Sequence, residues 1–338
     1  MSKKTYRQAV NEAILQEMRR DSSVILIGED VAGGAGGGGE DDAWGGPMAV
    51  TKGLLGEFGA NRVIDTPISE AGYMGMAIGA AASGQRPVAD LMFNDFVGVC
   101  FDQVVNQAAK YRYMYGGQDK IPLTIRTMIG AGLSISAQHS QCLYPVFSYF
   151  AGLKVVVPSG PYDAKGLLAS AIRDDDPVIF CEHKLLYEMV EEVPDEPYLI
   201  PFGEANFVRE GGDVTIVALS RMVHIALEAA KILAKEGIEC DIIDPRTTTP
   251  LDVETILESV EETGRLVIVD EAGPRCGMAS DIASVVAEEG FSSLEAPIIK
   301  VTPPHVPIPA APNLESLYIP NAGRVVAAAR KVMAKAQG

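Results

Sequence analysis

The sequence has 338 residues, 47% of them hydrophobic and 22% charged, with a formal net charge of −17 at pH 7. This length is enough for two domains with full cores. The negative charge argues against nucleic acid or an anionic membrane as a partner, since both bind through clustered Lys and Arg.

The cysteines and the N-terminal segment indicate the cellular compartment of the protein. The five cysteines lie far apart, without a CxxC pair, and the N-terminal segment MSKKTYRQAVNEA has no apolar signal core. Four of the five lie in or beside apolar segments, where a free cysteine behaves as a small buried hydrophobe. No run approaches the ~20 apolar residues of a membrane span. We therefore expect a reduced, cytoplasmic protein without a disulfide framework.

The first half of the chain alternates between helical and strand-like segments. Tyr6–Arg20 has helical periodicity, and Val24–Asp30 is typical of a buried strand. Further strands are predicted at PVADLMF, PLTIRTM, LKVVVPS and PVIFCEH, and further helices at Leu54–Phe58, from Glu70 onward, at Phe96–Tyr113 and at Asp163–Arg173. Strands that are apolar throughout and separated by helices indicate a parallel sheet with both faces covered.

A Pro- and acid-rich segment, Glu191–Pro201, divides the chain into predicted domains 1–195 and 196–338. The second half then restarts the alternation. Its predicted strands are DVTIVALS, CDIIDPRT, RLVIVDE and IIKVT, and its predicted helices are Met222–Lys235, Val253–Val260, Ala279–Glu288 and Gly323–Lys335. Both halves are therefore of the α/β class, each with a parallel sheet.

Two low-complexity segments are expected to be loops. Gly33–Gly46 contains a GxGxxG match, but the match runs into three acidic residues instead of opening a helix. A dinucleotide fingerprint needs helix amide groups that face a pyrophosphate, so we favour a mobile loop. Pro303–Pro312 is expected to be an extended surface connection.

The segment TPISEAGYMGMAIGAAAS carries a single carboxylate, Glu70, at the head of an otherwise nearly uncharged helix. Gly72, Gly75 and Gly79 recur at helical spacing, so one helix face lacks side chains and another surface can approach closely. An acid after Ser or Thr is also an ordinary helix start that the helix dipole favours. The residues alone leave both interpretations open.

His139 lies in GAGLSISAQHSQ, a Gly- and Ser-rich loop directly after a predicted strand. Such loops are where α/β sheets bind ligands, and an imidazole there could transfer protons near neutral pH. His183, His224 and His305 have no comparable setting, and a structural role for His139 stays equally open. No metal-ligand cluster, Ser-His-Asp order or phosphate-binding loop is evident. The sequence thus provides an acid, a histidine and apolar surroundings, but no group that would bind a charged cofactor. This is one half of an active site.

The chain resembles one known family over about residues 6 to 335. The matching segments are TPISEAGYMGMAIGAA, DLMFNDF, FDQVVNQAAKYRYMYGG, AQHSQ, LKVVVPSGPYDAKGLLASAIRDDDPVIFCEHKLLY and CDIIDPRTTTPLD. They are similar to the beta subunits of the thiamine-diphosphate-dependent first components of 2-oxo acid dehydrogenase complexes. The length of the Gly-rich loop resembles the acetoin dehydrogenase branch. The resemblance implies a transketolase-like pyrimidine-binding domain followed by a transketolase C-terminal-like domain.

The same resemblance implies that the cofactor site is shared between subunits. In the family, an alpha subunit with a GDG…NN motif holds Mg²⁺ and the diphosphate, and this chain has no GDG. The expected assembly is an alpha2-beta2 heterotetramer that works with a lipoyl-bearing acyltransferase.

Family motifs also imply roles for individual residues. Glu70 matches the glutamate that bonds the pyrimidine ring nitrogen and shares a proton with it. Phe96, Ile68 and Met92 match the apolar residues around that ring, and His139 matches a proton donor for lipoyl acylation. A structural potassium ion is implied at a set formed by Leu123, Ala171, Ile172, Asp174 and Asp176. Asp176 replaces an Asn of several relatives, and an ordinary acidic surface turn is an equal alternative.

The predicted function is therefore thiamine-diphosphate-dependent cleavage of acetoin, with transfer of the acyl group to the lipoyl arm. A pyruvate or branched-chain 2-oxo acid dehydrogenase beta subunit is the first alternative. A transketolase-like fragment is disfavoured because such enzymes usually carry both cofactor halves on one longer chain. A non-catalytic interaction subunit is the remaining alternative.

Overall fold

The computed structural model describes residues 1–33 and 45–335, so most of the Gly-rich segment that was predicted to be a loop lies outside the described residues. The chain forms two compact units that are not contiguous in sequence. Unit 1 comprises 1–129, 147–156 and 160–202, and unit 2 comprises 130–146, 157–159 and 203–338. The chain passes from unit 1 to unit 2 for the last time between residues 202 and 203. The predicted domain boundary at 195/196 lies near this point, and it stays a prediction.

Unit 1 is built on a parallel sheet with the strand order β6-β7-β5-β4-β2-β3. These strands are β2 (Val24–Glu29), β3 (Val63–Thr66), β4 (Arg86–Phe93), β5 (Thr124–Ile129), β6 (Lys154–Val156) and β7 (Val178–His183). Its helices are α1 (Tyr6–Arg20), α2 (Leu54–Phe58), α3 (Glu70–Ala82), α4 (Ala109–Met114) and α6 (Pro161–Arg173), and α5 (Tyr144–Ser148) begins in unit 2.

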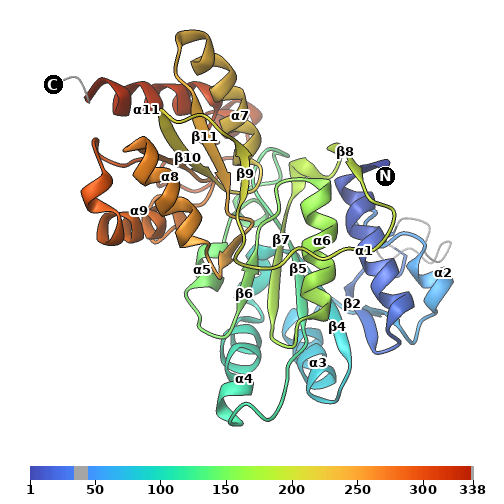
Figure 1. Ribbon diagram of the computed structural model, residues 1–338. Helices are drawn as coiled ribbons and strands as arrows, with labels where there is room; N and C mark the ends of the chain where they lie inside the picture. Colours follow the sequence, from blue (N-terminus) through green and yellow to red (C-terminus); the bar gives the residue numbers. More distant parts are fainter. Residues whose placement is uncertain (34–44, 336–338) are drawn as a thin grey trace. The chain divides into compact units, whose positions relative to one another are not determined.

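Helices α1 and α6 lie side by side against this sheet (Figure 1). Their apolar stripes, with Ile14 and Leu168 fully buried, meet Leu26 and Val88 of the strands in one core. Helix α1 begins with a capping box, in which the Thr5 hydroxyl accepts from the amide of Gln8 and the Gln8 side chain accepts from the amide of Thr5.

Unit 2 has a five-stranded sheet with the order β14-β13-β10-β11-β9, in which only the pairing of β9 with β11 is antiparallel. Its strands are β9 (Asn206–Arg209), β10 (Val214–Ala218), β11 (Cys240–Asp244), β13 (Leu266–Val269) and β14 (Ile299–Val301), with a short β12 at Thr247–Thr249. Its helices are α7 (Met222–Leu233), α8 (Val253–Thr263), α9 (Met278–Glu289), α10 (Pro312–Tyr318) and α11 (Ala322–Lys335).

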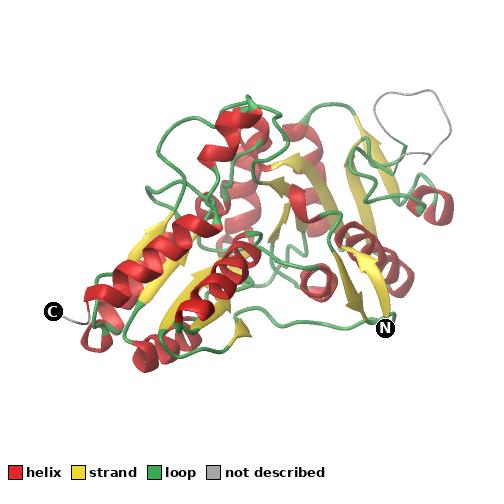
Figure 2. Cartoon of the chain, turned by 90° about the horizontal axis from the view of Figure 1, so that it is seen from above, coloured by secondary structure: helices red, strands yellow, loops and turns green. Residues whose placement is uncertain are grey.

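The sheet of unit 2 is covered on both faces, as Figure 2 shows. Alternate residues of β10 explain this arrangement, since successive side chains point to opposite faces. Val214 and Ile216 pack in the core that α7 and α11 cover. Thr215 points the other way, and its hydroxyl bonds Ser259 and Thr263 of α8 at 2.7 Å each.

Three sequence predictions need correction. The segment predicted as one helix at Phe96–Tyr113 is a 3-10 turn at Asn94–Gly98 followed by a helix from residue 101, because the helix-disfavouring Gly98 interrupts it. The predicted linker begins with a strand, β8 (Val190–Val193), which pairs antiparallel with β1 (Ser2–Thr5). The Pro-rich segment 303–312 lies outside helices and strands as far as residue 311. Only its last residue needs correction, since Pro312 begins α10, a position where proline is well tolerated.

The cysteines form no disulfide in this structure. All five are free, and only Cys276 is exposed. None of the helices in the described part of the chain combines the length and apolar character that a membrane crossing needs.

Candidate functional site

Glu70 is the first residue of α3, close after the carboxyl end of β3. Only 7% of its surface is exposed, and within residues 1–33 and 45–335 its carboxylate makes no hydrogen bond or ion pair. The Ser69 side chain does not cap the helix either. Neither oxygen is fully enclosed, so the mostly buried carboxylate keeps an open side where a ligand can supply a hydrogen bond.

The surroundings of Glu70 combine apolar burial with other acidic groups. Burial raises the pKa of the Cys100 thiol to about 12, and the negative charge of Glu70 contributes to this shift. Burial also raises the pKa of Glu29, with repulsion from Asp30 and Glu70 as further causes. Both shifts show that Glu70 lies among buried groups and other acids.

The predicted apolar neighbours come from two adjacent parts of unit 1. Met92 lies at the end of β4, Phe96 follows in the turn after it, and Ile68 precedes α3. Ile68 is 77% exposed, whereas Met92 and Phe96 are half-buried. Phe96 packs edge-on against Phe93 with ring centroids 5.6 Å apart. Strands β3 and β4 both flank β2, so these residues follow neighbouring carboxyl ends of the sheet, where α/β folds bind ligands.

Met92 has a left-handed backbone, with φ of 57°, which is costly for a residue with a side chain. Its amide donates to Asp90 Oδ1 at 2.9 Å, and Asp90 Oδ2 accepts from Arg126 at 2.7 Å. Arg126 is also bound to both carboxylate oxygens of Glu182, at 2.7 and 2.8 Å, and the Tyr187 hydroxyl donates to Glu182 at 2.9 Å. This buried network holds the backbone that presents Met92.

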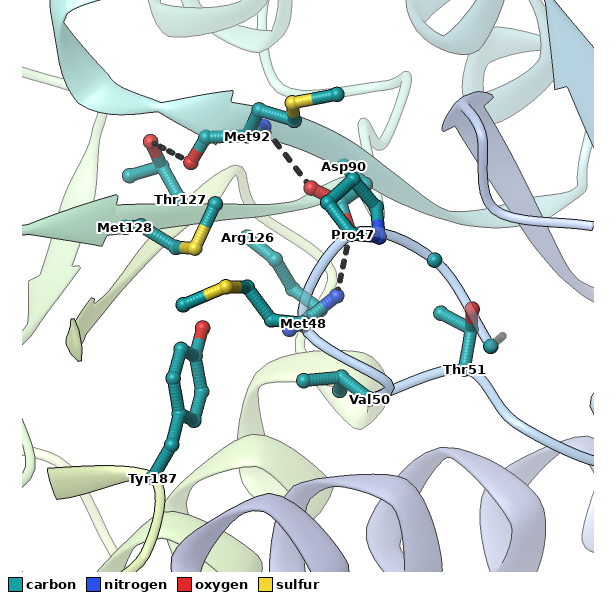
Figure 3. A pocket seen from close by; sticks show the side chains of 12 residues that line it. Pro47, Met48, Val50, Thr51, Asp90, Met92, Arg126, Thr127, Met128 and Tyr187 are labelled. Atoms are coloured by element: carbon teal, nitrogen blue, oxygen red, sulfur yellow. Dashed lines mark hydrogen bonds and ion pairs between the residues drawn. The ribbon is translucent and has the colours of Figure 1, made fainter. Parts of the chain in front are cut away.

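Met92, Asp90, Arg126 and Tyr187 line a cavity of about 20 Å³, large enough for one water molecule. Figure 3 shows these side chains. Burial raises the pKa of Glu182 in spite of the guanidinium beside it. Sequence reasoning missed this network. The available signal was a charged residue in each of two strands that are buried throughout, Arg126 in β5 and Glu182 in β7.

His139 belongs to unit 2 and lies half-buried in a 3-10 turn, Ala137–His139. Its loop is closed at the base by a hydrogen bond from the Gly130 amide to the Gln141 carbonyl at 3.1 Å. A cavity of about 650 Å³ lies beside the loop within unit 2. Gln138 and Gln141 of the loop line it, together with Arg275 and His305. The roles predicted for His139 and for the residues around Glu70 stay predictions at this point.

The predicted potassium residues lie at the opposite edge of the sheet of unit 1, near the amino ends of β5 and β7. The Ile172 and Asp174 carbonyls accept from the Arg86 guanidinium at 3.2 and 2.9 Å. Lys154 lies 2.7 Å from the Asp174 carboxylate, and Arg112 lies 2.6 Å from Asp176.

The remaining carbonyls of this predicted set also have partners. Leu123 accepts from the Val178 amide at 2.9 Å, and Ala171 accepts from the Asp174 amide at 3.2 Å. With three cationic side chains already in contact, the segment fits the surface turn better than an ion site, and the potassium ion stays a prediction.

Comparison with known proteins places this half-site in a family. The family model "Transketolase, pyrimidine binding domain" matches residues 2–189, and "Transketolase, C-terminal domain" matches residues 203–325. The chain is 62% identical over 331 residues to the acetoin:2,6-dichlorophenolindophenol oxidoreductase subunit beta of Cupriavidus necator, with 98% of both chains covered. The chain belongs to this transketolase-like family of dehydrogenase beta subunits.

Further relatives agree. The protein of the same title from Bacillus subtilis is 56% identical over 94% of both chains. The pyruvate dehydrogenase E1 component subunit beta of Rickettsia felis is 46% identical, with 97% of this chain and 98% of that protein covered. A solved structure titled "Split gene transketolase, inactive beta4 tetramer" matches with a TM-score of 0.79 and 26% identity, and 98% of each chain is covered.

These comparisons confirm the predicted family and the two transketolase-like α/β domains. The family is thiamine-diphosphate-dependent, and its beta subunits work with an alpha subunit in an oxidoreductase complex. The buried carboxylate of Glu70, without a partner among the described residues, fits a cofactor ring that offers a proton-sharing nitrogen.

Proposed function

We propose that this chain is the beta half of a thiamine-diphosphate-dependent active site that cleaves acetoin and acetylates a lipoyl group. The observation that carries the proposal is the burial of the Glu70 carboxylate, without a partner among the described residues, at the head of α3. The substrate rests on the relatives named for acetoin oxidation, which are 56–62% identical, against 46% for the pyruvate dehydrogenase subunit.

Glu70 acts by sharing a proton with the pyrimidine ring nitrogen. Met92 and Phe96 hold the ring from the end of β4, and the exposed Ile68 side chain reaches it from the approach to α3. When bound, thiamine diphosphate supplies a nucleophilic carbon that adds to the carbonyl group and an electron sink for breaking the C–C bond. The contribution of this chain is to orient the ring and to control one proton.

The overall reaction balances without another co-reactant. Acetoin is split at the bond between its carbonyl and carbinol carbons, and the carbinol half leaves as acetaldehyde. The acetyl half forms a thioester with one sulfur of the lipoyl disulfide, and the other sulfur takes up the electron pair and a proton. We assign delivery of that proton to His139, since an imidazole can donate one near neutral pH.

The diphosphate and its Mg²⁺ are assigned to the alpha subunit, because the sequence lacks a GDG motif and carries a charge of −17. The expected assembly is an alpha2-beta2 heterotetramer that serves a lipoyl-bearing acyltransferase. Free thiols at all five cysteines fit a reducing, cytoplasmic location.

The substrate is tested with the chain co-expressed with its alpha subunit. We expect 2,6-dichlorophenolindophenol to be reduced with a kcat/KM at least about tenfold higher for acetoin than for pyruvate, and only when thiamine diphosphate and Mg²⁺ are present. In this assay water and the dye replace the lipoyl group, so the acetyl half leaves as acetate. A preference for pyruvate would replace the substrate and leave the family unchanged.

A further inference from the structure

The loop that carries His139 is held by buried carboxylates of unit 2. We propose that Glu315 is a positioning residue for His139, which it controls through the backbone of residues 132–134. This inference rests on the proposed function, because it assigns Glu315 to the lipoyl step and not to the cleavage of acetoin.

Glu315 makes four hydrogen bonds to the loop. Its Oε1 accepts from the amides of Gly132 at 2.7 Å and Ser134 at 3.3 Å. Its Oε2 accepts from the amide and the hydroxyl of Ser134, both at 3.0 Å. Charge-assisted bonds of this kind are stronger than those between neutral groups, so one side chain fixes the backbone at Gly132 and Ser134.

Helix α10 buries Glu315 and Tyr318, and Tyr318 packs against Ala131 of the same loop. Glu315 is 3% exposed, whereas Leu314 and Leu317 of the same helix are 51% and 75% exposed. An ordinary surface helix would bury its leucines and expose its acid. The face of α10 that meets the loop therefore combines the Glu315 carboxylate with the apolar ring of Tyr318.

The loop conformation needs such support. Ser134 and Ser136 have φ values of 56° and 77°, in the left-handed region that disfavours residues with side chains. The amide of Ser134 is bound by Glu315, and the carbonyl of Ser136 accepts from the amide of His139 at 3.3 Å. The path from the carboxylate to the imidazole is therefore a short run of strained backbone.

Two further carboxylates anchor the ends of the same loop. Glu271 Oε1 accepts from the Ala131 amide at 2.7 Å, and the Tyr144 hydroxyl donates to the buried Asp270. Because these contacts keep the loop attached at both ends, a change at Glu315 is expected to shift the middle of the loop without releasing it.

The test compares two rates of the assembled enzyme. Dye reduction with acetoin reports cleavage, and acetylation of a lipoyl domain, followed by mass spectrometry, reports the step assigned to His139. In Glu315→Gln an NH2 group replaces one of the two accepting oxygens, so the bonds to that oxygen are lost and the remaining bonds are no longer charge-assisted. We expect acetylation to fall about tenfold, because small displacements of a proton donor are costly, while dye reduction stays within about twofold of wild type.

A double-mutant cycle separates positioning from general stability. In a His139→Ala background, Glu315→Gln is expected to cause no further loss of acetylation, since the group that it positions is already absent. Glu288→Gln, which removes a charge from an exposed position of α9, serves as the control and is expected to match wild type in both assays. Ser134→Ala removes only the hydroxyl contact, and we expect a loss of acetylation of about twofold to threefold.

Equal losses in both assays, or a full additional loss in the His139→Ala background, would overturn the positioning role. Should Glu315→Gln fail to assemble, an unchanged acetylation rate in Ser134→Ala overturns it as well. Absence of cofactor-dependent acetoin turnover in the wild type would instead overturn the proposed function, and this inference with it.

Discussion

Glu70 and Glu315 are both buried acids, and the difference between their partners separates their roles. Glu315 accepts four hydrogen bonds from a loop, whereas Glu70 has no hydrogen-bond or ion-pair partner in the described part of the chain. A buried acid with a complete set of donors organises structure, and one without donors is available to a ligand. Burial alone would have assigned both to the same class.

Glu70→Gln is the most direct test at the scale of a residue. The amide keeps the size of the side chain but cannot share a proton with a ring nitrogen, so we expect kcat of the assembled enzyme to fall on the order of 10²-fold or more. The dye-linked rate measures this loss. Asp119→Asn, at an exposed position of unit 1, is the matched control. A variant that assembles and retains its rate would identify the chain as an interaction subunit.

Asp175 gives unit 1 a pH-dependent contribution to stability. Its carboxylate accepts from Lys120 and Arg86 at 2.5 and 2.6 Å, and these cations, Lys120 foremost, lower its pKa. A lowered pKa in the folded state means that the stabilisation is complete above the unfolded value near 3.8. It is lost as the pH falls through the lower, folded value.

Asp175→Asn should therefore destabilise the protein only at higher pH. We expect the Tm to fall by about 2–4 °C at pH 6, the equivalent of about 1 kcal/mol for a partly exposed ion pair, and by less than about 1 °C at pH 2. Differential scanning calorimetry at the two pH values measures the difference. An equal fall at both would show that the aspartate acts through packing and not through its charge.

At the scale of elements, the three glycines predicted to form one open face of α3 differ. Gly72 and Gly75 face side chains of this chain, and Gly79 is left open. A methyl group added at Gly79 would meet no atom within 4 Å, and Gly79 is exposed with an ordinary helical backbone. Glycine in a helix lowers stability by about 0.5–1 kcal/mol relative to alanine. No contact within this chain requires a glycine at position 79. The glycine is therefore explained by a surface outside the chain, which we take to be the alpha subunit.

Gly79→Ala is expected to have opposite effects on the chain and on its complex. The Tm of the isolated chain should rise by about 1–3 °C, because a helix former replaces glycine. Assembly with the alpha subunit, measured by analytical ultracentrifugation, should weaken about tenfold or more, because the methyl group blocks close approach. Gly56→Ala in α2 is the matched control, since it too meets no atom within 4 Å, and it should stabilise the chain without affecting assembly. Undiminished assembly of Gly79→Ala would place the alpha subunit elsewhere.

At the scale of the whole molecule, the sequence predicts the elements that carry a strong apolar pattern. Val24–Glu29 and Val214–Ala218 are found close to their predicted positions because buried parallel strands are apolar throughout. Short strands such as β1 and β8 were missed, since their half-polar residues are defined by pairing across the sheet edge.

The residues of the candidate site also differ in how well the sequence predicts them. Glu70 could be singled out because it is an acid in an apolar helix, and that signal is local. The contact of Arg126 with Asp90 joins residues 36 apart in sequence, and the contacts of Glu315 with the His139 loop join residues 181 and 183 apart. Only the contact of Met92 with Asp90 is local. No periodicity or spacing reveals the long-range contacts, although a charge inside a buried strand marks one partner of the first. Predictions from sequence were therefore best for the group that meets the ligand and weakest for the groups that hold it.

The division of the cofactor site between two subunits makes a prediction for the isolated chain. The binding energy of thiamine diphosphate is expected to come largely from Mg²⁺ and the diphosphate, for which this acidic chain offers no GDG motif. We expect calorimetric titration of the chain alone to give no measurable heat up to about 1 mM cofactor with Mg²⁺, which corresponds to less than about 4 kcal/mol of binding free energy.

The assembled enzyme should bind thiamine diphosphate, and removal of Mg²⁺ with a chelator should abolish that binding. A pyrimidine analogue without the diphosphate is the control, and it should bind neither form measurably. Magnesium-dependent binding by the isolated chain would show that the diphosphate site lies on this subunit and would overturn the division proposed here.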